Sequence, residues 1–231
     1  MADYRYFGAY ASFVAADKAS GELLQGADFI VGDEFSIEFR SSDKPAETDG
    51  QPEEHAGQSG EVAWVKNRFG AFAGYLDADM SRRLRIVAAR GWTMRAFLSF
   101  VAFTDSPEPG FYWGQVALVC YDPLLEDAFG PWCKALAEKM AEGARVEVAL
   151  TTAEVDRVLE SEGAWLPSGR ADIPKPEKGK TAILKQSRSF SEKMVDLGRA
   201  QRPRCMVVGW IFNIALIAGV VALVLHFCGV F

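Results

Sequence analysis

Residues 92 to 121 read WTMRAFLSFVAFTDSPEPGFYWGQVALVCY. The stretch contains two long runs rich in aromatic and β-branched residues, Trp92 to Thr104 and Phe111 to Tyr121, and such runs favour β-strands. Between them, DSPEPG supplies two prolines and a glycine, which are typical of a connecting loop. The sequence therefore predicts two long strands that follow one another directly in the chain.

Shorter β-prone runs precede this stretch. Apolar and polar residues alternate strictly from Phe35 to Arg40, as expected for a strand with one face in a core and the other in water. Further strands are predicted at Tyr4 to Ala16, Glu61 to Lys66 and Phe69 to Leu76, the last two as a hairpin.

Helices are predicted on both sides of the two long strands. Asp77 to Arg90 is one, because an aspartate can cap its first turn and Gly91 can end it. After the two long strands, a helix is predicted at Leu124 to Glu142, interrupted near Gly130 and Pro131. A strand is predicted next, at Arg145 to Leu150. The last helix is predicted at Ala153 to Gly163, where Thr151 and Glu154 can form a capping box at its start. This order of elements predicts the α+β class.

The chain divides into three parts by composition. Residues 1 to 167 have the length of one globular domain, within which 41 to 60 lack large apolar residues and are expected to form a disordered loop. This domain holds 15 Lys and Arg against 27 Asp and Glu, a net charge of −12. Residues 168 to 205 hold ten Lys and Arg against four acids, so we expect a flexible basic linker attracted to anionic lipid headgroups.

The third part, residues 206 to 231, reads MVVGWIFNIALIAGVVALVLHFCGVF and contains no Asp, Glu, Lys or Arg. As a helix it would reach roughly 39 Å, more than the ~30 Å hydrocarbon core of a bilayer. We therefore expect a tail-anchored, single-pass membrane protein. The basic flank at 168 to 205 places the N-terminal domain in the cytoplasm and the C-terminus outside or in a lumen, by the positive-inside rule.

Within this predicted span, small residues recur at helical spacing. Ala215 and Gly219 form one such pair, Ala218 and Ala222 form a second on an adjacent face, and Asn213 is the single amide. These residues fit the packing of a protein partner or of a second copy of the chain, although packing against lipid alone suits the small residues equally well. Asn213 is the harder one to leave without a partner in lipid.

The run Gly32 to Ile37, then Glu61 to Val65, then Gly70 to Leu76, a helix, and Gly91 before a long strand resembles the HIRAN domain. The resemblance covers about Tyr4 to Tyr121, and rests on the order of elements and on a turn before the helix. It implies a small mixed or antiparallel β-barrel with two or three helices, related in shape to OB folds. The known activity of that family is gripping the 3′ end of single-stranded DNA.

The resemblance makes Tyr4, Tyr6 and Tyr75 candidate ligand-binding residues. The chain departs from the family where the polar cluster after the second strand is replaced by the acidic loop 41 to 60, and where Tyr75 is followed by Asp77 and Asp79 rather than by basic residues. A binder of phosphate chains needs positive charge to release counterions. We therefore expect a barrel with an altered ligand, and not nucleic acid as its partner.

Other candidate sites come from residue types alone. Phe111, Tyr112 and Trp113 cannot all point inward from one strand, so an exposed member is a candidate ligand or partner contact. His55 and His226 are too few and too far apart for a metal site or a catalytic triad, and four scattered cysteines read as free thiols. We expect no catalytic residue, no metal and no cofactor.

These observations favour a non-enzymatic binding or scaffolding module with a HIRAN-like domain, held at the inner face of a membrane. Two alternatives stay open. One is a membrane-anchored binder of single-stranded nucleic-acid ends. The other is a membrane-associated enzyme, which would require a deep pocket with converging carboxylates.

Overall fold

The computed structural model of the chain describes residues 5–41, 61–106, 108–169, 171–172 and 180–200. The chain splits into two compact units, Met1–Arg188 and Ser189–Phe231, and each is considered by itself. The expected loop at 42 to 60, Tyr4, and the predicted span with Asn213, Ala215, Gly219 and Ala222 lie outside the described residues. No helix in the described part of the chain is long and apolar enough to cross a bilayer.

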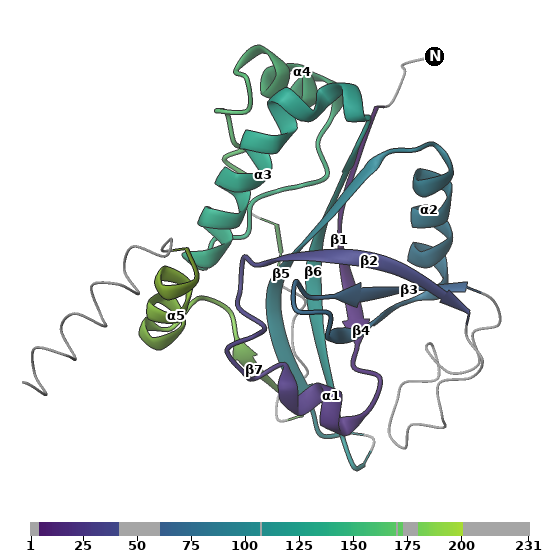
Figure 1. Ribbon diagram of the computed structural model, residues 1–231, viewed down its shortest axis with the longest axis vertical. Helices are drawn as coiled ribbons and strands as arrows, with labels where there is room; N and C mark the ends of the chain where they lie inside the picture. Colours follow the sequence, from purple (N-terminus) through teal and green to yellow (C-terminus); the bar gives the residue numbers. More distant parts are fainter. Residues whose placement is uncertain (1–4, 42–60, 107, 170, 173–179, 201–231) are drawn as a thin grey trace, which may run out of the picture. The chain divides into compact units, whose positions relative to one another are not determined.

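The first unit is an α+β domain built on a closed antiparallel β-barrel of six strands (Figure 1). The strands are β1 (Tyr6–Val14), β2 (Glu34–Ser41), β3 (Glu61–Lys66), β4 (Phe72–Leu76), β5 (Thr93–Thr104) and β6 (Phe111–Tyr121). They pair in the order β2-β3-β4-β1-β6-β5, and Glu34 and Phe35 of β2 pair with Phe97 and Ala96 of β5 to close the ring. The predicted α+β class and the predicted antiparallel barrel are therefore confirmed.

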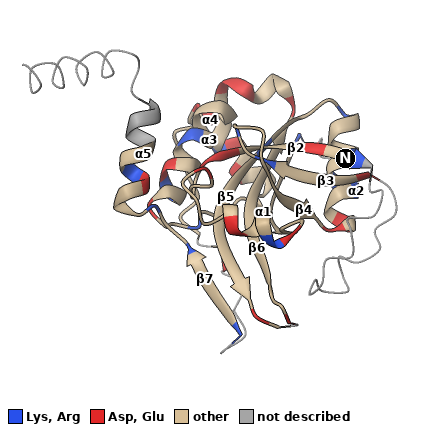
Figure 2. Ribbon diagram, turned by 60° about the horizontal axis from the view of Figure 1, so that its bottom comes forward, with Lys and Arg blue, Asp and Glu red and all other residues tan. Residues whose placement is uncertain are grey.

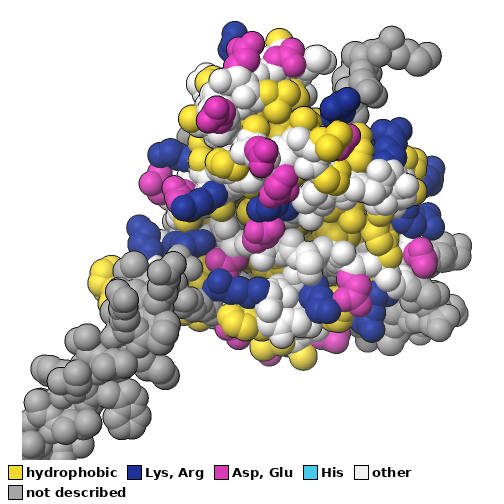
Figure 3. All heavy atoms as spheres, turned by 45° about the horizontal axis from the view of Figure 1, so that its top comes forward, with side chains coloured by type: hydrophobic (Ala, Val, Ile, Leu, Met, Phe, Trp, Pro, Cys, Tyr) yellow, Lys and Arg dark blue, Asp and Glu magenta, His cyan; other side chains and the backbone are white. Residues whose placement is uncertain are grey.

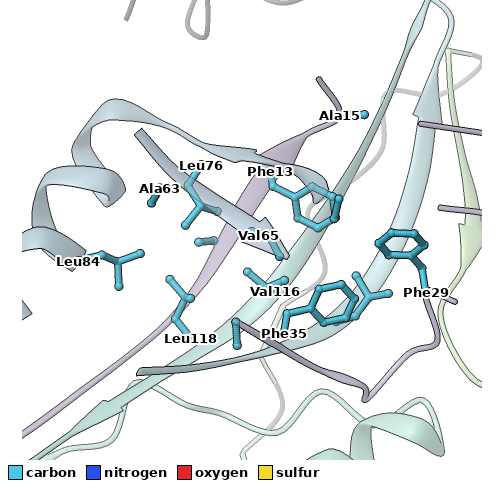
Figure 4. Close-up of a cluster of buried hydrophobic side chains, with 14 of the residues drawn as sticks. Phe13, Ala15, Phe29, Phe35, Ala63, Val65, Leu76, Leu84, Val116 and Leu118 are labelled. Carbon is cyan, nitrogen blue, oxygen red and sulfur yellow. The ribbon is translucent and has the colours of Figure 1, made fainter. Parts of the chain in front are cut away.

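The interior of the barrel is filled by alternate residues of its strands. Val116 and Leu118 of β6 face Phe13 of β1 and Phe35 of β2, and helix α2 (Ala78–Ala89) adds Leu84 to the same cluster (Figure 4). All five of these side chains are almost completely buried. Because burial of a large aliphatic or aromatic side chain stabilises a fold by about 1.5–3 kcal/mol, this cluster is the main source of the barrel's stability.

A second core lies on the outer face of the barrel. The β6 residues between the interior ones, Ala117, Val119 and Tyr121, pack with Phe129 and Trp132. The helices on this side are α3 (Glu126–Ala141), preceded by the short 3-10 helix η2 (Pro123–Leu125), and α4 (Thr152–Glu160). Since β6 is buried on both faces, its sequence reads as a nearly continuous apolar run.

Two tyrosine hydroxyls fix the segment that crosses this second core. Tyr6 donates to the carbonyl of Val148 and Tyr10 to the carbonyl of Val146, both over 2.7 Å. The predicted strand from Arg145 to Leu150 is wrong: only Val146 forms an isolated β-bridge, and the carbonyls of Val146 and Val148 accept from tyrosine hydroxyls. Its alternating pattern arises because Val146 and Val148 face the second core.

The helix signals were mostly reliable. Asp77 caps α2 by accepting from the backbone N–H of Met80, and Thr151 and Glu154 form the predicted capping box of α4. The predicted interruption near Pro131 is wrong, since α3 runs through it without a break. A short helix, α1 (Lys18–Leu23), occupies a segment for which the sequence analysis predicted no helix or strand, and Asp17 caps it.

The expected flexible linker is corrected over residues 180 to 188. Here β7 (Thr181–Lys185) pairs antiparallel with the second half of β5, beyond the point where β5 pairs with β2 (Figure 1). Lys185 Nζ donates to the carbonyls of Gly26 (2.7 Å) and Phe29 (3.1 Å). The compact domain therefore extends from the expected boundary at 167 to Arg188, because basic side chains of the supposed linker bind backbone carbonyls of the barrel domain.

The second unit contains α5 (Phe190–Ala200). Its start is fixed by a capping box, in which the Glu192 carboxylate accepts from the Ser189 backbone N–H at 2.9 Å and from its hydroxyl at 3.0 Å. Ser189 Oγ accepts in return from the backbone N–H of Glu192 at 3.3 Å. A helix therefore occupies residues that the sequence analysis assigned to a flexible linker.

Candidate functional site

The turn that ends α2 brings a guanidinium and an indole together. Gly91 adopts φ +71°, which favours glycine, and the N–H groups of Gly91 and Trp92 donate to the carbonyls of Ala88 and Val87 at 2.9 and 3.3 Å. This tight turn ends α2 and leads the chain directly into β5. As a result, Arg90 Cζ lies 5.5 Å from the centre of the Trp92 ring, within the range of a cation–π contact.

A pocket of about 410 Å³ opens between this turn and the first strand of the barrel. We call it the α2 pocket; it is lined by Tyr6, Phe7, Arg83, Ile86, Val87, Arg90 and Trp92. Ile86, an aliphatic residue of this lining, is 52% exposed and so is accessible to a ligand. The pocket thus combines an apolar floor with two arginines.

The charge at this pocket is positive, against the acidic balance of the domain. Arg83 pairs with Asp79 one turn earlier at 2.9 Å, in an exposed ion pair that contributes little to stability. Acidic residues are spread over many elements, including α1 and α3 (Figure 2), and on the face shown in Figure 3 basic side chains border apolar surface on the side where α2 lies as well as on the opposite side. A ligand that suits the α2 pocket carries an anionic group beside an apolar or planar one.

Tyr6 lines the α2 pocket but is held by the second core. Its ring stacks on Phe129 with centroids 5.0 Å apart and meets Trp132 edge-on at 6.4 Å, and its hydroxyl is bonded to Val148. Burial raises the pKa of the Tyr6 phenol well above its usual value. Tyr6 therefore forms a wall of the pocket rather than a mobile stacking group.

A second cationic surface lies on the outer face of β2, β3 and β4. Arg40 Cζ and Lys66 Nζ lie 4.6 and 5.4 Å from the centre of the Phe72 ring, and Lys66 also donates to Glu38 at 2.8 Å. The hydrogen bond from Lys66 is the main reason that the pKa of Glu38 is lowered. We call these residues, with Trp64, the cation–aromatic face.

Tyr75 lies beside this face but is only 2% exposed. Its ring is tilted against Trp64 with centroids 5.3 Å apart, and Trp64 in turn meets Phe72 edge-on at 5.6 Å. Of the three, Trp64 and Phe72 are half-buried and Tyr75 is buried. The predicted candidate Tyr75 therefore supports the half-buried rings of Trp64 and Phe72 and does not itself reach a ligand.

The three aromatic residues that begin β6 are half-buried, and two of them have internal partners. Tyr112 packs on Phe103 and accepts from the amide of Gln25 at 3.0 Å, while the Trp113 indole donates to the Thr104 hydroxyl at 2.9 Å. Phe111 pairs with Thr104 at the end of the hairpin. Trp113 and Tyr75 both pair with Val14, from opposite sides of β1, whereas Tyr6 pairs with Tyr121 at the other end of β6, so the predicted aromatic candidates do not form one site.

A larger pocket, of about 480 Å³, lies at the end of α3, but its charges are already matched. Lys139 pairs with Glu142 at 3.0 Å. The guanidinium of Arg145, 4% exposed, donates to Ser99 Oγ and Gln115 Oε1, each at 2.6 Å, and lies 4.2 Å from the centre of the Tyr10 ring. These contacts attach the segment around Arg145 to the barrel, which is a structural role for a charged residue of this pocket. We therefore favour the α2 pocket as the ligand site.

Nothing among the described residues points to bound metal: no group of three or more His, Cys, Asp and Glu is suitably placed. Neither histidine is among these residues, and the side chains that line the α2 pocket include no carboxylate. Comparison with protein families, with curated proteins and with solved structures gave no match.

Sequence reasoning missed Arg83, Ile86, Arg90 and Trp92. A signal was present, because Arg82, Arg83, Arg85 and Arg90 make the segment before the long strand the most basic part of the domain. The run Arg90-Gly91-Trp92 also indicates the end of a helix followed by an aromatic residue. The sequence gives no sign that Phe7, more than 80 residues before Arg90, lines the same pocket.

Proposed function

We propose that the chain is a membrane-tethered, non-enzymatic binding module whose HIRAN-like barrel presents the α2 pocket to a partner. The observation that carries the proposal is the pairing of Arg90 with Trp92 at an open pocket beside the exposed Ile86. Guanidinium next to an indole and an aliphatic side chain suits an acidic segment of a protein that carries an aromatic or aliphatic residue.

The membrane part of the proposal is supported by the sequence. Residues 206 to 231 have the length and composition of a span, and the basic residues before it favour a cytoplasmic barrel. Lys185 and Arg188 are engaged with the barrel domain, so attraction to anionic headgroups would come from the basic residues that follow, from Lys193 to Arg204. Asn213, Ala215, Gly219 and Ala222 would pack against a membrane partner or a second copy.

The tether in this proposal is short. The compact barrel unit ends at Arg188, so 17 residues lie between it and residue 206. Eleven of them form α5, which is about 16 Å long at 1.5 Å per residue. The barrel therefore works close to the bilayer, and its partner would be a membrane protein or a protein recruited to the surface.

The experiment is a binding titration of the full chain in detergent with two fluorescent probes. One probe is a short peptide rich in Asp, Glu and aromatic residues, and the other is a single-stranded oligonucleotide. Binding of the peptide should weaken about 10-fold or more in Arg90→Glu, since a charge-assisted contact is lost and replaced by repulsion. Arg82→Glu, on the same helix but outside the pocket lining, is the matched control and should bind as the native chain does.

A single-stranded nucleic-acid end is the second candidate ligand. The observation in its favour is that the α2 pocket and the cation–aromatic face both place basic groups over aromatic rings, as binders of single strands do. Against it stands the net charge of −12 over residues 1 to 167. Salt-dependent binding of the oligonucleotide, weakened by Arg90→Glu, would decide for this candidate. Failure of both probes to bind the native chain, or equal binding by Arg90→Glu, would contradict a role of the pocket.

A further inference from the structure

Helix α5 carries large apolar side chains that the structure leaves exposed. Phe190 is 80% exposed, Met194 55% and Val195 37%. Phe190 and Met194 are four residues apart, so they lie on one side of the helix one turn apart. Val195 and Lys193, both exposed, flank that side, one at each edge. Apolar groups of this size gathered on one side of a helix point to an interaction surface.

The position of α5 in the chain limits what can cover this side. Only five residues separate Ala200 from Met206, the first residue of the apolar run, and two of them are Arg202 and Arg204. Six virtual bonds of at most about 3.6 Å allow a separation of about 22 Å. If the apolar run spans a bilayer, the end of α5 must therefore lie within about 22 Å of the interface.

We propose that α5 lies in the surface of the membrane, with Phe190 and Met194 directed into the boundary between headgroups and acyl chains. This inference rests on the proposed membrane function. Amphipathic helices of this kind bury their apolar side about 5–10 Å deep, and basic residues beside them attract anionic lipids. Lys193 and the arginines that follow supply that attraction.

The helix is suited to form independently of the barrel. Its first turn is closed by the capping box of Ser189 and Glu192, and this satisfies two backbone N–H groups that would otherwise be left open at a membrane surface. An interfacial helix would turn the chain from the surface into the span.

The test uses the full chain in phospholipid vesicles with an anionic component. Cys205 and Cys228 are replaced by serine; Cys120 and Cys133 can stay, because both are buried and burial raises their pKa to about 12, so they resist labelling. A polarity-sensitive fluorophore is then attached at Met194→Cys or, as the matched control, at Asp196→Cys, which helical spacing places on the side away from Phe190 and Met194. Both positions lie in α5, outside the compact barrel unit, so neither change should affect the barrel.

We expect emission from position 194 to shift to the blue and to be quenched by lipids that carry a nitroxide near the headgroup, with much weaker effects at 196. Equal, water-like emission at both positions in protein that stays in the vesicles would overturn the interfacial helix but leave the membrane span standing. A blue shift at 194 without quenching would overturn it too, since another protein surface would then cover the helix. Loss of the protein from the vesicles would contradict the span itself, and with it this inference.

Discussion

The guanidinium of Arg188 donates to the carbonyl of Val31 over 2.6 Å and to the carboxylate of Asp33 over 3.2 Å, although more than 150 residues separate them in the chain. Asp33 is 8% exposed, and its other oxygen lies 3.5 Å from Arg68 in the turn between β3 and β4. A carboxylate at the start of the second strand thus connects two distant parts of the chain. This contact, with Lys185, is what makes residues 180 to 188 part of the barrel domain.

Replacing Arg188 by alanine is expected to release β7. The change removes hydrogen bonds from a largely buried carboxylate and a buried carbonyl, so we expect a loss of about 1–3 kcal/mol in the free energy of unfolding. Amide hydrogen exchange should show loss of protection at β7 before any loss at β6. Replacement of the exposed Arg82 by alanine serves as the control. Unchanged hydrogen exchange at β7 in Arg188→Ala would contradict the role of Arg188 in holding β7 to the barrel.

Arg145 is expected to be the most sensitive charged residue of the domain. Its guanidinium bonds two side chains in different directions, Ser99 and Gln115, and lies over the Tyr10 ring. Truncation to alanine leaves these buried partners unsatisfied and should cost about 3 kcal/mol or more in stability. Arg145→Lys keeps the charge but not the planar fork, so it should restore only part of that loss in a urea titration. Full restoration by lysine would show that charge alone matters there.

Trp132 is fully buried, and its indole N–H finds no hydrogen-bond partner in the described part of the chain. Trp132→Phe removes this donor and keeps a ring against Phe129, whereas Trp132→Ala also leaves a cavity. We expect alanine to cost about 3–5 kcal/mol and phenylalanine clearly less, measured as free energies of unfolding. Equal losses in the two variants would mean that the indole N–H has a stabilising partner.

The barrel domain should lose stability in alkaline solution. Burial raises the pKa of Cys120 and of Cys133 from 9.0 to about 12, and burial likewise raises the pKa of Tyr10 from 10.0 to about 12. Above pH 9 the unfolded chain releases protons that the folded chain retains. The stability is therefore fully present below pH 9 and decreases as the pH rises toward 12.

The two thiols alone should lower the free energy of unfolding by about 2.7 kcal/mol per pH unit within that window. Urea unfolding at successive pH values measures this slope, and the ultraviolet absorbance of thiolate should appear only as the protein unfolds. A midpoint urea concentration that stays constant from pH 8 to pH 11 would contradict the burial of the two thiols.

The strands were predictable where one face meets the core and the other meets water. The alternation from Phe35 to Arg40 and the capping of α2 by an aspartate were predicted correctly, since both are local effects; the structure selects Asp77 over Asp79 as the cap. Helix α1 was missed because it is short and contains Gly21, which is required there: a Cβ would collide with the ring of Tyr112, a residue far away in sequence.

The remaining differences share one physical cause, which is contact between distant segments. Val146 and Val148 alternate like a strand, but two tyrosine hydroxyls from β1 bind the carbonyls of this segment. Lys185 and Arg188 read as linker charges, yet backbone carbonyls near Phe29 and Val31 accept their hydrogen bonds. The α2 pocket escaped prediction for the same reason, because its walls come from β1 and from the turn between α2 and β5.

The most direct test of the account is whether the full chain remains in a bilayer after extraction with alkaline carbonate, scored by flotation of the vesicles on a density gradient. The barrel is expected to lose stability at that pH, so the scored quantity is retention and not folding. We predict that the native chain floats with the lipid, and that a variant with Ala215→Arg and Gly219→Arg does not, since two charges at the middle of a span oppose insertion. Release of the native chain into the soluble fraction would contradict the proposal that the chain is a membrane-tethered module.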